Sequence, residues 1–223
     1  LACNTAVCIE LTHMRLKKPL VVALDLEGTL VPEIWISVAE KTGIKKLRLT
    51  TRDVPDYDAL MKMRLAILRE HNLTLKDIQN VIRAIRPYLG VLSFLRWLKK
   101  YGEVVILSDT FYEFAAPIVE RLGNPMLLCN SLSIDRDGTI IGHHVRQKDG
   151  KRNAVRAFQN LGFHVIAIGD SFNDVGMIKE ADAGAFLNAP QAIAEKFPSI
   201  PSLKNYRAAR SFVQSSVDNP DTK

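Results

Sequence analysis

Short apolar runs alternate along this chain with segments in which apolar residues recur every three or four positions. The runs at residues 21–24, 104–107, 164–169 and 183–187 are typical of buried β-strands. The periodic segments from residue 90 onward predict amphipathic helices over 90–101, 113–122 and 151–161. Because strands that alternate with helices favour a parallel sheet covered by helices, we expect an α/β fold.

Residues 33–87 differ from this alternation, because their pattern is helical throughout. The spacing predicts helices over 33–43, 56–72 and 74–86, with a capping box at Thr74 and Asp77 and a stop at Pro87. We therefore expect a helical cap, inserted after the first strand into a core made of residues 20–32 and 88–205. Asp137-Gly138, between two alternating runs, predicts a small β-hairpin.

The two ends of the chain carry weaker signals. Residues 1–19 are predicted to be an N-terminal extension, in which Met14 could be the natural start. Residues 206–223 are predicted to be a disordered tail.

Composition excludes several classes of protein. The chain of 223 residues is 47% hydrophobic and 24% charged, which is ordinary for a soluble globular protein. Its net charge of +6 is scattered and no nucleic-acid-binding motif is present, so we expect no nucleic-acid partner. No apolar run approaches the roughly 20 residues that span a bilayer, so no membrane contact is expected. The three cysteines match no zinc pattern, and we expect a reduced, cytoplasmic setting.

Acidic and hydroxyl residues follow three of the predicted strands. They are Asp25 and Glu27, then Ser108, Asp109 and Thr110, and finally Asp170, Ser171, Asn173 and Asp174. A buried, unpaired carboxylate is costly, so stability alone does not explain this pattern. Ligands bind at the carboxyl ends of parallel strands, so we expect one oxygen-rich pocket that holds Mg²⁺. Lys148 and Lys151 both precede a helix, and either could face a phosphoryl group.

In this order, "DLEGT", the strand-terminal serine, a lysine before a helix and "GDSFND" resemble the four motifs of the haloacid dehalogenase (HAD) superfamily. The resemblance covers about residues 20–190 and implies a Rossmann-like sheet and an aspartyl-phosphate mechanism. It implies that Asp25 is the nucleophile, that Ser108 and Lys151 contact the phosphoryl group, and that Asp25, the backbone carbonyl of Leu26, Asp170 and Asp174 hold Mg²⁺. Lys151 is preferred over Lys148 because Ala154, Val155 and Phe158 follow it in the family's helical pattern.

Glu27 is a departure from the superfamily, whose phosphatases mostly have aspartate at this position as the acid–base residue. Glutamate keeps the carboxyl group but moves it by ~1.3–1.5 Å. Acid–base function survives this change in principle, whereas fast attack by water on the phosphoaspartate is less assured.

The helical insertion resembles the phosphoserine phosphatase branch, in which a glutamate and a cap arginine grip the substrate's amino and carboxylate groups. Glu33 and Arg64 stand at the matching places, and we expect Ser108, Asp109, Thr110 and Asn173 to line the same substrate site. "DLEG", "VPEIWI", "TTRD" and "ILSDTFYEF" resemble a bifunctional subgroup that also transfers the phosphoryl group from O-phospho-L-serine to L-homoserine. The same resemblance suggests a homodimer.

Other interpretations remain open at this point. Ser108 could cap the next helix, Arg64 could lie on a solvated helix face, and Glu33 could serve only the first turn of its helix. Trp35 is predicted to be a core residue. The rival functions are a HAD phosphatase for another small phosphomonoester and a non-catalytic phosphoamino-acid sensor on the same scaffold.

Overall fold

A computed structural model describes residues 18–50, 53–54 and 56–219 of the chain. Met14, Cys3 and Cys8 lie outside these residues, and so does most of the predicted N-terminal extension. Cys129 is buried and forms no disulfide. No helix among the described residues is long and apolar enough to cross a membrane.

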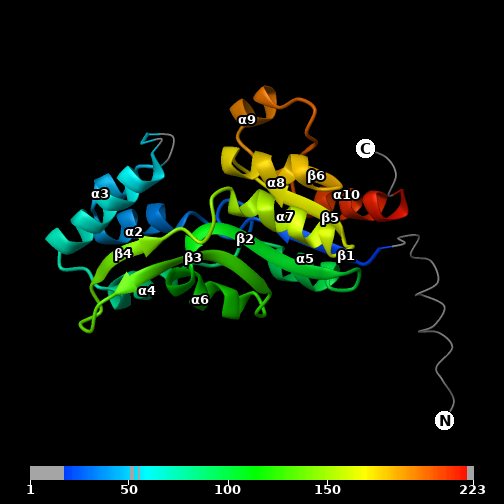
Figure 1. Cartoon of the computed structure of the whole chain (residues 1–223). Helices are drawn as coiled ribbons and strands as arrows, with labels where there is room; N and C mark the ends of the chain where they lie inside the picture. The colour runs from blue at the N-terminus through cyan, green and yellow to red at the C-terminus, as the bar shows by residue number, and fades with distance from the viewer. Residues whose placement is uncertain (1–17, 51–52, 55, 220–223) are drawn as a thin grey trace, which may run out of the picture.

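Seven strands form one sheet in the order β4-β3-β2-β1-β5-β6-β7 (Figure 1). The strands are β1 (Leu20–Leu24), β2 (Glu103–Phe111), β3 (Met126–Ile134), β4 (Ile140–His144), β5 (His164–Gly169), β6 (Ala183–Leu187) and β7 (Ser202–Leu203). Every neighbouring pair is parallel except β3 and β4, which form the predicted hairpin. The expected α/β fold is confirmed, and β1 lies at the centre of the sheet.

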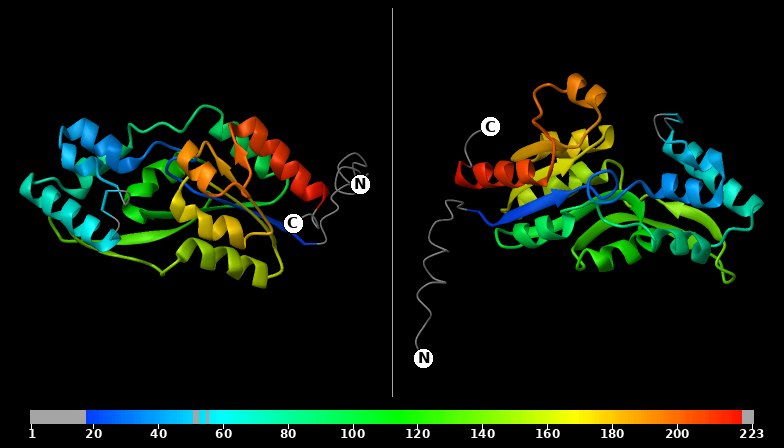
Figure 2. Two further views of the ribbon diagram at one scale, coloured as in Figure 1. Left: turned by 90° about the horizontal axis from the view of Figure 1, so that it is seen from above. Right: turned by 180° about the vertical axis from the view of Figure 1, so that it is seen from behind.

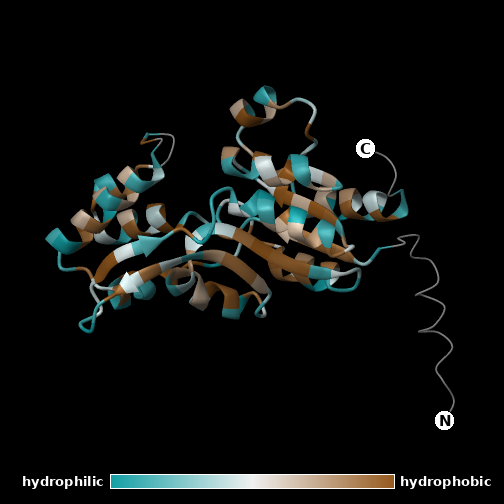
Figure 3. Cartoon of the chain, viewed as in Figure 1, coloured by the Kyte–Doolittle hydropathy of each residue, from teal (hydrophilic) through white to brown (hydrophobic). Residues whose placement is uncertain are grey.

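Helices cover both faces of the sheet. They are α5 (Val91–Leu98), α6 (Tyr112–Arg121), α7 (Gly150–Asn160), α8 (Val175–Glu180), α9 (Gln191–Lys196) and α10 (Tyr206–Asp218). Alternate residues of β1 face opposite layers: Val22 belongs to the core that includes α5, α6 and α10, and Ala23 to the core that includes α7 and α8. This explains why β1 is apolar without interruption, and Figure 3 shows the strands as mostly hydrophobic.

Between β1 and α5 the chain is helical, as expected. This helical insertion (residues 33–87) contains α2 (Ile34–Thr42), the 3-10 turn η1 (Lys45–Arg48), α3 (Tyr57–Glu70) and α4 (Leu75–Ile82). The capping box is present, because the Asp77 carboxylate accepts from the Thr74 N–H at 2.9 Å. Helix α4 ends at Ile82, however, several residues before the predicted stop at Pro87. The division into a core and a separate cap stays a prediction.

The hairpin connects the sheet to the helical insertion. At its turn the Leu75 N–H donates to the carbonyl oxygen of Gly138 at 2.9 Å, and α3 packs on β4. Both hairpin strands are longer than the apolar runs alone indicate, and β2 likewise continues through Ser108–Phe111. Pairing with a neighbouring strand therefore extends these strands beyond their apolar residues.

The prediction of a disordered tail is wrong for residues 206–218, which form helix α10. Asn205 caps the helix, since its side-chain oxygen accepts from the Ala208 N–H at 2.9 Å. Ala209, Val213 and Val217 recur every four residues and are buried against α5, β6 and β7. These residues form only a narrow apolar stripe, which is buried because the helix packs against the sheet. Seen from above and from behind (Figure 2), α10 and the helical insertion lie at opposite ends of the molecule.

Candidate active site

Three aspartates meet at the carboxyl ends of β1 and β5. Asp25 directly follows β1, Asp170 follows β5, and Asp174 ends the short turn η2 (Phe172–Asp174). All three are buried, and one carboxylate oxygen from each lies within 4.8 Å of the others. Nζ of Lys151 bridges Oδ1 of Asp25 at 2.6 Å and Oδ1 of Asp174 at 2.7 Å. Lys151 thus lies among the aspartates, whereas the side chain of Lys148 is exposed.

The charges of this carboxylate cluster (Asp25, Asp170 and Asp174) are not balanced. Burial and the charge of Asp174 raise the pKa of Asp25 well above its usual range and that of Asp170 to about 7. Burial alone would lower the pKa of Lys151, but the charges of Asp174 and Asp25 raise it overall. When all three buried carboxylates are ionised, one buried cation leaves a surplus of negative charge. A divalent cation with oxygen ligands fits this arrangement.

The backbone around the cluster leaves little space. Gly28 has φ +81°, and a Cβ at this position would fall on the Asp170 carboxylate. Oδ2 of Asp174 accepts from the N–H groups of Asp170 and Ser171 at 3.0 and 2.9 Å, and the Thr29 hydroxyl donates to Oδ1 of Asp170 at 3.1 Å. These bonds fix the orientation of the carboxylates.

Leu26 does not fit the ligand role that the family resemblance implied. Its side chain is fully buried in the core. Its carbonyl oxygen accepts from the N–H groups of Leu30 and Val31 at 2.8 and 3.0 Å. Both lone pairs are thus used by the turn after β1, so we do not include Leu26 among the proposed metal ligands.

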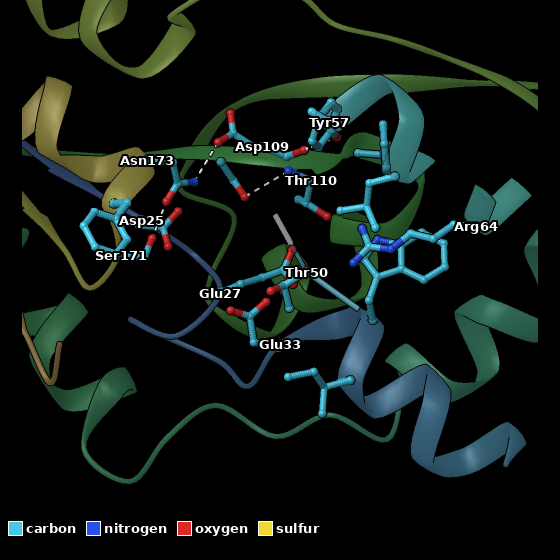
Figure 4. A pocket seen from close by; sticks show the side chains of 16 residues that line it. Asp25, Glu27, Glu33, Thr50, Tyr57, Arg64, Asp109, Thr110, Ser171 and Asn173 are labelled. Carbon is cyan, nitrogen blue, oxygen red and sulfur yellow. Dashed lines mark hydrogen bonds between the residues drawn. The ribbon is translucent and has the colours of Figure 1, made fainter. Parts of the chain in front are cut away.

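A cavity of about 280 Å³ opens between the strand ends and the helical insertion. Figure 4 shows Asp25 and Asn173 on one side of it, Arg64 on the other, and Glu27, Glu33 and Thr110 between them. The strand ends and the loop after β5 contribute Asp25, Glu27, Ser108, Asp109, Thr110, Phe111, Ser171, Phe172 and Asn173. The helical insertion contributes Glu33, Trp35, Ile36, Thr50, Tyr57, Leu60 and Arg64. Apart from Leu26, each predicted site residue thus lies in this pocket or in the cluster beneath it.

The end of β2 places Ser108 and Thr110 at the pocket and links two other elements to it. Ser108 is buried, and its Oγ accepts from the Thr110 N–H at 3.2 Å. Helix α6 begins later, at Tyr112, without a side-chain cap, so Ser108 does not cap it. The exposed Asp109 accepts from Nδ2 of Asn173 at 2.7 Å with its carboxylate and from the Tyr57 hydroxyl at 3.0 Å with its carbonyl.

Glu27 contacts the start of the helical insertion. Its Oε2 accepts from the N–H of Ile34, the first residue of α2, at 2.7 Å. Burial and the nearby charge of Glu33 raise the pKa of Glu27 to about 8. The carboxyl group therefore carries a proton through much of the neutral range, as a general acid requires.

Arg64 supplies a fixed cation at the far side of the pocket. It is 6% exposed, so the alternative of a solvated helix face is wrong. Its guanidinium carbon lies 4.5 Å from the centroid of the Trp35 ring, and Nη2 donates to the Leu49 carbonyl at 2.8 Å. Its Nε is buried without a hydrogen-bond partner among the described residues. Burial lowers its pKa to about 10, so it stays protonated near neutral pH.

Two pocket residues make contacts that the sequence did not predict. Trp35 is buried, as predicted, but its ring also supports the Arg64 guanidinium. Tyr57 ties α3 to the backbone of Asp109. Because this bond ends on a carbonyl group, no side-chain pattern could have indicated it. Glu33 is exposed and lies at the pocket, where its predicted role in binding stays a proposal.

The chain belongs to the haloacid dehalogenase-like hydrolases, whose family model matches residues 20–182. It is 52% identical over 197 residues, 88% of this chain and 96% of the relative, to phosphoserine phosphatase ThrH of Pseudomonas aeruginosa. It is also 52% identical over 186 residues, 83% of this chain and 78% of the relative, to a phosphoserine phosphatase of Pseudomonas syringae pv. tomato. The family resemblance of the sequence is thus confirmed.

A solved structure shares the fold. It is a phospho-aspartyl intermediate analogue of a phosphoserine phosphatase, with a TM-score of 0.73 and 21% sequence identity. The match covers 89% of this chain and 99% of that one. The two proteins therefore share one fold over most of their length.

Proposed function

We propose that this protein is a Mg²⁺-dependent phosphoserine phosphatase that also transfers the phosphoryl group from O-phospho-L-serine to L-homoserine. The observation that carries the proposal is one cavity with a carboxylate–lysine cluster at one side and a buried guanidinium at the other, whose Nε–H has no partner in the part of the chain that the structure describes. In a phosphomonoester that also has a carboxylate, the phosphoryl group would lie at the carboxylate–lysine cluster and the carboxylate at the guanidinium. The similarity to two phosphoserine phosphatases supports this substrate.

In the first step a carboxylate oxygen of Asp25 forms a bond to phosphorus, and the bond from phosphorus to the serine oxygen breaks. Glu27 gives its proton to the departing serine oxygen. Lys151 and Ser108 stabilise the negative charge on the phosphoryl oxygens. Mg²⁺, held by Asp25, Asp170 and Asp174, supplies further positive charge when bound and reduces the repulsion between the two anionic groups.

In the second step an acceptor attacks the phosphoaspartate. Glu27, now ionised, takes the proton from water or from the homoserine hydroxyl as the new oxygen–phosphorus bond forms. The bond between phosphorus and Asp25 breaks, so the Asp25 carboxylate is regenerated. Inorganic phosphate or phosphohomoserine leaves according to the acceptor.

Residues of the helical insertion bind the amino-acid end of the substrate. The Nε–H of Arg64 donates to the substrate carboxylate, and Glu33 accepts from the substrate's ammonium group. Asp109, Thr110 and Asn173 line the phosphoryl side. Closure of the helical insertion over the substrate excludes bulk water and brings Glu33 and Arg64 to the amino-acid end. We place this activity in the cytoplasm, in a homodimer.

A pair of substrates tests the role of the carboxylate. O-phospho-L-serine and phosphoethanolamine differ only in that group, so phosphate release with MgCl₂ should favour phosphoserine. Because a charged hydrogen bond contributes about 1.5–3 kcal/mol, we expect kcat/KM to differ by roughly tenfold to a hundredfold. Arg64→Lys should remove most of this preference. Equal rates in the wild type would instead favour the rival phosphatase for another phosphomonoester.

Asp25→Asn separates the enzyme from a non-catalytic sensor. In the enzyme this variant loses turnover, while binding of phosphoserine persists in equilibrium dialysis. A wild-type protein that binds phosphoserine but releases no phosphate with MgCl₂ would support the sensor instead.

Homoserine tests the transfer reaction. Phosphate release from phosphoserine should fall when L-homoserine is added, and phosphohomoserine should appear in proportion. Phosphate release unaffected by homoserine would leave a phosphatase without transfer activity.

A further inference from the structure

Helix α10 is connected to the carboxylate cluster through one threonine. The Tyr206 hydroxyl donates to the backbone carbonyl of Thr29 at 2.6 Å, and the Thr29 hydroxyl donates to Oδ1 of Asp170 at 3.1 Å. Thr29 is fully buried, and Asp170 is nearly so. Two hydrogen bonds thus join the first residue of α10 to one of the three carboxylates.

The position of Tyr206 is fixed by packing on α5. The ring centroids of Tyr206 and Phe94 lie 5.2 Å apart, and a Cβ on Gly90 would come within 3.3 Å of the Tyr206 ring. Burial raises the pKa of the Tyr206 phenol, so its hydroxyl keeps the proton that it donates. The contact is therefore a stable property of the fold.

The turn that receives this bond has little freedom of its own. The N–H of Gly28 donates to the Val31 carbonyl at 2.8 Å, and Gly28 lies against the Asp170 carboxylate. A shift of the Thr29 backbone would therefore move both groups that contact Asp170. Helix α10 lies beyond residues 20–182, which the family model matches, and Tyr206 has no part in the proposed chemistry.

We propose that Tyr206 is a positioning residue of the metal site. By holding the Thr29 carbonyl it keeps the Thr29 hydroxyl against Asp170 and so orients that carboxylate toward a divalent cation. Groups that orient metal ligands commonly affect metal affinity even though they do not touch the ion. The inference rests on the proposed function in that Asp25, Asp170 and Asp174 are taken to bind the cation.

Titration with Mn²⁺, followed by the electron paramagnetic resonance signal of the free ion, tests this without any turnover. Tyr206→Phe keeps the ring and removes only the hydroxyl. We expect its Kd for Mn²⁺ to be about three- to tenfold higher than that of the wild type, the shift that loss of one ordinary hydrogen bond produces. Tyr112→Phe is the control, because Tyr112 also donates to a backbone carbonyl, that of Leu127, but from α6. It should bind Mn²⁺ as the wild type does.

A double variant tests whether Tyr206 acts through Thr29. Thr29→Val removes the donor to Asp170, so adding Tyr206→Phe to it should raise the Kd no further. A double variant that binds markedly more weakly than Thr29→Val alone overturns the inference, and so does Tyr206→Phe with wild-type affinity. If the wild type itself binds no Mn²⁺, both the metal site of the proposed function and this inference are wrong.

Discussion

At the scale of single residues, the Glu27 carboxylate lies between the strand end and the helical insertion. Its bond to the Ile34 N–H uses a backbone donor that every helix leaves free at its start, and Glu33 offers α2 no side-chain cap. Aspartate, which is ~1.5 Å shorter, would not reach the same donor without a shift of the backbone. The additional methylene of Glu27 thus lets its carboxylate accept from the first N–H of α2. From the sequence alone, Glu27 was recognisable only as a departure from the family.

Glu27→Asp should raise the ratio of hydrolysis to transfer. A shorter carboxyl group, released from Ile34, can activate water as the usual aspartate of the superfamily does. The measurement is the ratio of phosphate to phosphohomoserine formed from phosphoserine at a fixed homoserine concentration. The control is Glu40→Asp, the same change at an exposed position of the insertion that pairs with Arg48. An unchanged ratio in Glu27→Asp would contradict the explanation.

At the scale of elements, strongly periodic segments were predicted well and α10 was not. The helices of the insertion have apolar stripes that are visible without a partner. Helix α10 fully buries only Ala209, Val213 and Val217, and most of the residues between them are polar. Such a stripe is stable only when a sheet surface is already present, so the sequence alone did not indicate it.

Asn205→Ala should lower the free energy of unfolding by about 1 kcal/mol, the usual cost of losing a helix N-cap. The reason is the lost bond between the Asn205 side chain and the Ala208 N–H. Urea unfolding followed by circular dichroism measures the change. Asn205→Asp keeps an acceptor at this position and should stay close to the wild type. If Asn205→Ala leaves the midpoint of unfolding unchanged, the end of α10 contributes little to the stability of the fold.

At the scale of the whole molecule, the pocket exists because the helical insertion is held over the strand ends. Contacts that reach across include Tyr57 to the Asp109 carbonyl, His143 to the Asp58 carboxylate at 3.0 Å, and the Leu75 N–H to the Gly138 carbonyl. The first of them lies in the pocket itself. The position of α3 is thereby linked to Asp109, which in turn holds Asn173.

Tyr57→Phe should loosen α3 without unfolding the sheet. We expect the amide hydrogens of residues 57–70 to exchange about three- to tenfold faster, because local opening no longer breaks this bond. Exchange in β1 and β5 should not change. Mass spectrometry of peptides from both regions measures this, with Tyr112→Phe as the control for loss of a tyrosine hydroxyl. Equal exchange of α3 in wild type and variant would show that the remaining contacts of the helical insertion suffice to hold it.

The sequence by itself determined the α/β sheet, the helical insertion and the positions of Asp25, Asp170 and Asp174. These follow from local periodicity and from polar residues at strand ends, and both are properties of short segments. Only the tertiary structure showed that Lys151 rather than Lys148 lies beside the aspartates, and that the Leu26 carbonyl accepts hydrogen bonds within a turn. It also showed that the Trp35 ring packs against Arg64 and that most of the predicted tail forms α10. Each of these depends on groups far apart in the chain, or on backbone atoms that every residue has in common. A pattern of side chains therefore could not indicate them before the chain was folded.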